Sequence, residues 1–107
     1  MAAAFERSET AQLLLQFALD PASGSQPREV AVRALPRLAR HNAEVQTELI
    51  GLLDTRDWRL RGALIEALGE FDTERVASAL EELWEIETDV RHRRAIERVL
   101  AREARRL

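Results

Sequence analysis

The 107-residue sequence contains no cysteine, no lysine and no tyrosine. Without cysteine it can form neither a disulfide framework nor a thiolate zinc site. Four glycines and three prolines are too few for the many turns of an all-β domain. No apolar run approaches the roughly 20 residues of a membrane span, and the first residues lack the features of a signal peptide. These absences predict a cytoplasmic protein that makes no contact with a membrane.

All 16 basic residues are arginine, and 19 acidic residues give a net charge of −3. An acidic balance makes nucleic acid an improbable partner for the chain as a whole. The arginine bias has two explanations. It reflects a GC-rich genome, or it marks a surface selected for planar guanidinium groups that bind carboxylates.

Residues that carry common catalytic or metal chemistry are sparse. The two histidines, His41 and His92, are far apart, and no HExxH, G-x-S-x-G or glycine-rich phosphate loop occurs. We interpret His41 as a helix-end residue and His92 as a packed structural residue. The sequence therefore predicts no catalytic residue, no metal site and no cofactor.

Apolar residues that recur with a helical period predict six helices. Asn42, Asp57 and Asp89 each precede such a segment and are suited to cap it, and either Thr73 or Asp72 can cap the fifth. The joints are short, so neighbouring helices should be antiparallel. The expected helices cover residues of about 5–19, 27–40, 43–53, 58–71, 74–87 and 90 to nearly the end.

Alternate helices repeat one another. The segment "RLRGALIEALGEF" aligns with "HRRAIERVLARE" after a shift of 32 residues, and with "REVAVRALPRL" after a shift of 33 residues in the other direction. Three copies of a two-helix unit, at about 5–40, 43–71 and 73–106, thus account for the chain. This period is typical of a helical solenoid, in which each hairpin buries its apolar face against the next.

The pattern D-x-x-L-R-x-A-x-x-x-A-L-G at 57–69 resembles the second-helix motif of HEAT-like (armadillo-type) repeats. The resemblance implies an all-α, right-handed α-solenoid of three two-helix repeats, with six antiparallel helices in one domain over 1–107. First helices would then be convex and second helices concave. It also implies an inter-repeat ladder of ion pairs and caps, which is incomplete in the first unit, where Gly24 replaces the aspartate. The ladder residues are Asp57, Asp89, Arg28, Arg61 and Arg93.

The last helix carries a stripe of arginines at steps of three or four residues, and residues 90–107 have a charge of +5. Three interpretations are open: a solvated end cap of the solenoid, a contact for an acidic protein, or a surface that follows phosphates. The stripe consists of Arg91, Arg94, Arg98, Arg102 and Arg105.

The first helix is apolar around about two-thirds of its circumference, including Leu13, Leu14 and Phe17. We expect a protein to cover it, either an upstream domain of the same polypeptide or a second copy of the chain. The chain is then a fragment of a larger protein or part of an oligomer. In the alternative, Phe5 and the loop that follows the helix fold over this surface.

These features favour a non-catalytic scaffold for protein–protein or interdomain contacts. We interpret Trp84 as a core residue, whereas Trp58 either packs over a turn or marks a contact. The candidate contact residues are Arg61, Arg94, Arg98, Trp58, Leu13 and Leu14.

A second function is implied by another resemblance. The segment "DVRHRRAIERVLAR", together with the motif before it, is similar to the HEAT-like C-terminal region of bacterial aminopeptidase N-like zinc metallopeptidases. That resemblance implies the helical tail of an enzyme, without its zinc ligands or catalytic glutamate.

Overall fold

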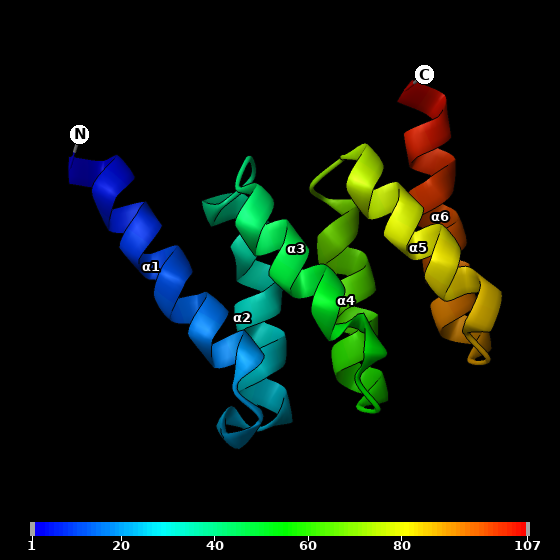
Figure 1. Ribbon diagram of the computed structural model, residues 1–107, viewed down its shortest axis with the longest axis horizontal. Coiled ribbons are helices and arrows are strands. Elements are labelled where there is room, and N and C mark those ends of the chain that lie inside the picture. The colour runs from blue at the N-terminus through cyan, green and yellow to red at the C-terminus, as the bar shows by residue number, and fades with distance from the viewer. Residues whose placement is uncertain (1, 107) are drawn as a thin grey trace.

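The computed structural model describes the backbone of residues 2–106 and the side chains of residues 8–105. Over this range the chain is all-α and contains no strand (Figure 1). Two short 3-10 turns, Pro21–Ser23 and Leu52–Asp54, join helices. The α-helices are α1 (Ala2–Leu19), α2 (Ser25–Leu38), α3 (Ala43–Gly51), α4 (Trp58–Gly69), α5 (Glu74–Ile86) and α6 (Val90–Arg106).

Side-chain caps fix where α3, α4 and α5 begin, at the residues that the sequence predicted. Asn42 Oδ1 accepts a hydrogen bond from the Val45 N–H at 3.1 Å. The Thr73 hydroxyl likewise accepts from the third residue of its helix at 3.3 Å, and Asp57 Oδ1 accepts from two N–H groups of α4. Each cap satisfies helix N–H groups that have no partner within the helix.

The beginnings of α1 and α2 differ from the prediction. Helix α1 starts at Ala2 in place of residue 5, and α2 starts at Ser25, two residues before Pro27. Gly24 has a φ of +86°, a conformation that side-chain-bearing residues rarely adopt. It lets the chain pass directly from the 3-10 turn into α2. The side chain of Phe5, proposed as a cover for α1, lies outside the described residues.

The hairpins α1–α2, α3–α4 and α5–α6 stand side by side in two layers (Figure 1). One layer contains α2, α4 and α6, and the other contains α1, α3 and α5. Helix α4 occupies the centre, contacts α2, α3, α5 and α6, and buries Leu60, Leu64, Ile65 and Leu68 completely. The first and last hairpins lie at opposite ends, in a slab of 41 × 36 × 16 Å. The α-solenoid prediction is confirmed.

Two glycines of α4 allow α6 to approach closely. A Cβ atom at Gly69 would lie 2.6 Å from Val99 Cγ2, a distance that real Cβ contacts do not reach. A Cβ atom at Gly62 would lie 3.2 Å from His92 Nε2. Gly62 and Gly69 are seven residues apart, and so are their neighbours His92 and Val99. The close contact therefore follows one stripe along each helix.

Candidate protein-contact surface

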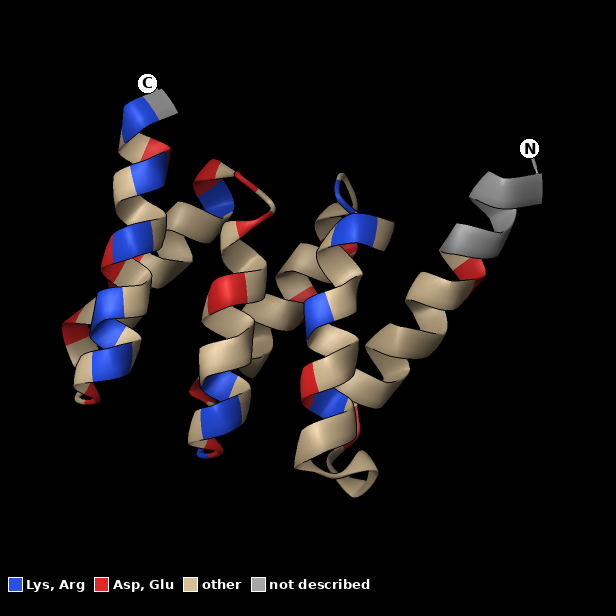
Figure 2. Ribbon diagram, turned by 180° about the vertical axis from the view of Figure 1, so that it is seen from behind, with Lys and Arg blue, Asp and Glu red and all other residues tan. Residues whose placement is uncertain are grey.

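The two layers carry opposite charge. Figure 2 views the layer of α2, α4 and α6, here called the basic layer, with arginines concentrated on α6. Its exposed basic residues include Arg33, Arg37, Arg59, Arg91, Arg94 and Arg98. Helices α3 and α5, here called the acidic layer, expose Glu44, Glu48, Glu74, Glu81, Glu82 and Glu85. A partner of either sign therefore meets one favourable face and one unfavourable face.

An open groove of about 410 Å³ runs over the basic layer. We call it the Trp58 groove. Small residues of α4 and α6 lie along it, and longer charged side chains border it. Its lining residues are Glu29, Arg33, Trp58, Arg59, Gly62, Ala63, Glu66, Arg91, His92, Ala95 and Arg98.

Trp58 is the aromatic anchor of this groove. Its side chain is 46% exposed, and the guanidinium carbons of Arg59 and Arg91 lie 5.6 and 4.7 Å from the ring centroid. The buried His92 ring lies 6.3 Å away on the inner side. A half-exposed indole with two cations near its ring is compatible with a contact residue, and this interpretation of Trp58 stays a prediction.

Several cations around the groove are not neutralised. Arg33 pairs with Glu66 at 2.7 Å, but Arg91 reaches Asp89 only at 3.5 Å and its side chain is 72% exposed. Within residues 8–105, no carboxylate lies within ion-pair distance of Arg59, Arg94 or Arg98. These guanidinium groups keep their hydrogen-bonding capacity for a ligand.

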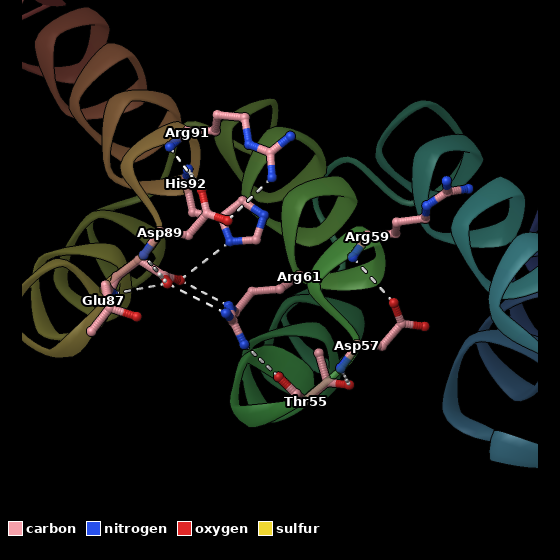
Figure 3. Close-up of polar contacts among 9 residues, drawn as sticks. Thr55, Asp57, Arg59, Arg61, Glu87, Asp89, Arg91 and His92 are labelled. Carbon is pink, nitrogen blue, oxygen red and sulfur yellow. Dashed lines mark hydrogen bonds and ion pairs between the residues drawn. The ribbon is translucent and has the colours of Figure 1, made fainter.

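Arg61 is partly buried and belongs to a polar cluster around the buried Glu87 (Figure 3). Its Nε and Nη2 donate to the two carboxylate oxygens of Glu87 at 2.8 and 3.3 Å, and Nη1 donates to the Thr55 carbonyl at 2.7 Å. The Glu87 side chain is 2% exposed and also accepts from the Thr88 and Asp89 N–H groups. Arg61 therefore links the second and third repeats, and because its side chain is 20% exposed, its place among the candidate contact residues stays a prediction.

Among the ladder residues, the two aspartates cap helices, and Arg61 forms its ion pair with Glu87. Asp57 accepts a hydrogen bond from the Ser25 hydroxyl of the preceding repeat at 2.6 Å. Arg28 donates to the Ala18 carbonyl at 2.8 Å, and Arg93 stacks on the Trp84 ring at 4.1 Å. Asp89 caps α6. Glu87, which follows α5 directly, supplies the carboxylate opposite Arg61 and was not among the predicted ladder residues.

The outer face of α1 is a second exposed surface. Leu13 and Phe17 are 58% and 52% exposed, whereas Leu15 and Ala18 are buried against the core. Leu14 is partly buried and borders an open, mainly apolar groove of about 390 Å³ between α1 and α2. The 3-10 turn that follows α1 leaves Leu13 and Phe17 exposed, so in the described part of the chain nothing covers this face.

Other kinds of site have no basis in the described residues. They contain no group of three or more histidine, aspartate or glutamate side chains that could hold a metal ion. None of the helices that the structure describes is long and apolar enough to cross a membrane.

The buried cluster makes a testable contribution to acid stability. Burial opposes ionisation of Glu87, but hydrogen bonds from the Asp89 N–H and Arg61 outweigh it, so the pKa of Glu87 lies below its ordinary value of 4.5. A lowered pKa stabilises the fold fully above that ordinary value, and the stabilisation is lost as the pH falls through the folded-state pKa.

We therefore expect Glu87→Gln to flatten the loss of stability below about pH 4.5, as measured by denaturant unfolding at a series of pH values. Some acid sensitivity should persist, because the pKa values of Asp57 and Asp89 are also lowered. Parallel pH profiles for the wild-type chain and the variant would contradict this assignment.

Stacked two-helix hairpins that share one elongated core define an α-solenoid repeat protein. A family model described as HEAT repeats matches residues 11–101. The chain belongs to the HEAT repeat family, as the second-helix motif predicted. A search of curated proteins finds no match, and neither does a search of solved structures.

Proposed function

We propose that this chain is a non-catalytic scaffold that contacts another protein through its basic layer. HEAT repeats generally serve as scaffolds for protein interactions. The observation that supports the basic layer is the Trp58 groove, where an exposed indole lies among four arginines, of which Arg59 and Arg98 have no carboxylate partner among the described residues. Tryptophan and arginine are enriched among the residues that dominate binding energy at protein interfaces.

The rigidity of the groove also favours binding. The groove is lined from α4 by Trp58 and Ala63, and from α6 by Arg91 and Ala95. These two helices pack closely against each other at the glycines of α4. The guanidinium groups of Arg59 and Arg91 lie near the indole ring and restrict its movement, so less side-chain freedom is lost when a partner docks. A surface that is ordered before binding retains more of its interaction energy as affinity.

The proposal is tested by affinity capture from extracts of the cells that make the protein. We expect Arg94→Glu/Arg98→Glu to lose a protein that the wild-type chain retains, because both guanidinium groups are exposed and lie on the basic layer. The control, Glu81→Arg/Glu82→Arg, reverses two exposed charges on the acidic layer and should retain it. Surface changes of this kind alter stability by about 0.5 kcal/mol or less, which thermal unfolding of each variant checks. Loss of the captured protein with the control variant alone would overturn the proposal.

Two narrower hypotheses stay predictions. A partner over α1, whether an upstream domain or a second copy, fits the exposure of Leu13 and Phe17. The resemblance to the aminopeptidase C-terminal region is not supported by the HEAT repeat match, which is common to many proteins with this motif.

A further inference from the structure

We infer that the Trp58 groove binds an extended acidic segment of the partner protein, with glutamate or aspartate side chains paired to its arginines. The inference rests on the proposed function, because it names the chemistry of the partner at the same surface. It depends on three observations: the charge of the groove, the arrangement of its arginines around Trp58, and the small residues between α4 and α6.

The charge of the groove is local and positive. Four arginines and two glutamates line it, and one of these glutamates, Glu66, is already neutralised by Arg33 at 2.7 Å. Arg59 and Arg98 have no carboxylate partner among the described residues. The chain as a whole has a net charge of −3, so this positive surface does not simply follow the composition. An acidic segment is the complementary ligand.

The arginines beside Trp58 can bind carboxylates. Arg59 and Arg91 lie 5.6 and 4.7 Å from the Trp58 ring centroid. A guanidinium that interacts with an aromatic face still presents N–H donors in its own plane, and these match a carboxylate in a bidentate geometry. The indole thus positions two donors at the end of the groove and offers apolar area to the stem of a bound glutamate.

The middle of the groove has room for a peptide backbone. Gly62 and Ala63 of α4 face Ala95 of α6 there, so no long side chain obstructs it. At about 410 Å³, its volume falls within the range of roughly 300–1,000 Å³ that is usual for ligand sites. A short extended segment fits this shape, with side chains that reach Arg59 and Arg91 at one end and Arg98 farther along α6.

Nucleic acid fits the surface less well. The acidic layer lies across a slab that is 16 Å in its shortest dimension, so at 0.1 M salt, where charges are screened over about 10 Å, it opposes only a polyanion long enough to reach its exposed glutamates. Single-stranded nucleic acid also stacks successive bases on several aromatic side chains, whereas Trp84 is partly buried and pairs with Glu97.

The inference is tested by fluorescence anisotropy with the full chain. The probe is a short fluorescein-labelled peptide of Glu and Ser residues. A Gln and Ser peptide of the same length and an oligothymidine serve as comparison ligands. We expect the acidic peptide to bind, and Arg59→Glu/Arg91→Glu to weaken binding at least about tenfold, because two like charges then face the ligand.

The control is Arg37→Glu/Arg40→Glu, which makes the same change in net charge at two exposed residues outside the groove. It should weaken binding by less than about threefold, because distant exposed charges are screened.

Emission from Trp58 gives a second readout. In a Trp84→Phe background Trp58 is the remaining tryptophan, and its emission should shift when the acidic peptide binds. The inference is overturned if the acidic peptide does not bind, if both double variants weaken binding equally, or if oligothymidine binds as tightly. A wild-type chain that does not bind the peptide, yet captures a protein in a way that depends on Arg94 and Arg98, overturns this inference alone. The proposed function would then stand.

Discussion

Replacement of Glu87 by alanine is expected to lower the free energy of unfolding by about 3 kcal/mol. Removal of one partner of a buried ion pair leaves the other charge uncompensated, which typically destabilises a protein by ~3–5 kcal/mol. The Glu87 side chain is 2% exposed and that of Arg61 is 20% exposed, so water can reach part of the abandoned guanidinium. This access places the expected loss at the lower end of the range. Urea unfolding followed by circular dichroism measures it.

A matched control separates burial from charge. Glu85→Ala removes an exposed glutamate of α5, and should change stability by less than about 0.5 kcal/mol. The double variant Arg61→Met/Glu87→Met should be less destabilised than the sum of the two single variants, because neither charge is left alone. If Glu87→Ala had no larger effect than Glu85→Ala, the cluster would not hold the second and third repeats together.

Leu68→Ala should also destabilise the chain by about 3 kcal/mol, since a leucine-to-alanine change in a core typically leaves a cavity and costs ~2–5 kcal/mol. Leu68 is fully buried in the central helix, which packs against helices of all three hairpins. A repeat protein is stabilised by contacts between neighbouring hairpins, so a cavity at this position weakens the junctions on both sides. Thermal and urea unfolding should each show the loss.

Leu13→Ala is the appropriate comparison, because the same chemical change is made where the leucine is 58% exposed. We expect a change of less than about 0.5 kcal/mol. A loss as large as that of Leu68→Ala would contradict the exposure of this face and show that α1 is covered in solution. Light scattering at several concentrations would then reveal whether a second copy provides the cover.

Much of the fold could be predicted because its determinants are local. Apolar periodicity gives the helices, and Asn42, Asp57 and Thr73 give three of their starts through hydrogen bonds to residues two or three positions away. The start of α2 could not be read in this way. It depends on the positive φ of Gly24. A glycine in a loop is compatible with many backbone conformations, so its position in the sequence does not predict this one.

The surface was harder to predict because its contacts join residues that are distant in sequence. Arg61 and Glu87 are 26 residues apart, and nothing in the spacing distinguishes Glu87 from the exposed glutamates of α5. The ladder residue Asp89 is not the partner of Arg61, because its Oδ1 accepts the N–H groups of Arg91 and His92 at the start of α6. The exposure of Trp58 likewise depends on how Arg59 and Arg91 meet across two helices.

The glycine contacts between α4 and α6 have a geometric consequence for the whole stack. Helix α4 packs against α2 and α6 far more extensively than α3 packs against α5. The distance between successive hairpins is thus shorter in the layer of α2, α4 and α6, which contains Gly62 and Gly69, than in the layer of α3 and α5. A stack with unequal rises bends toward its shorter side, and further hairpins of the same design would wind into a superhelix with arginines on its inner wall.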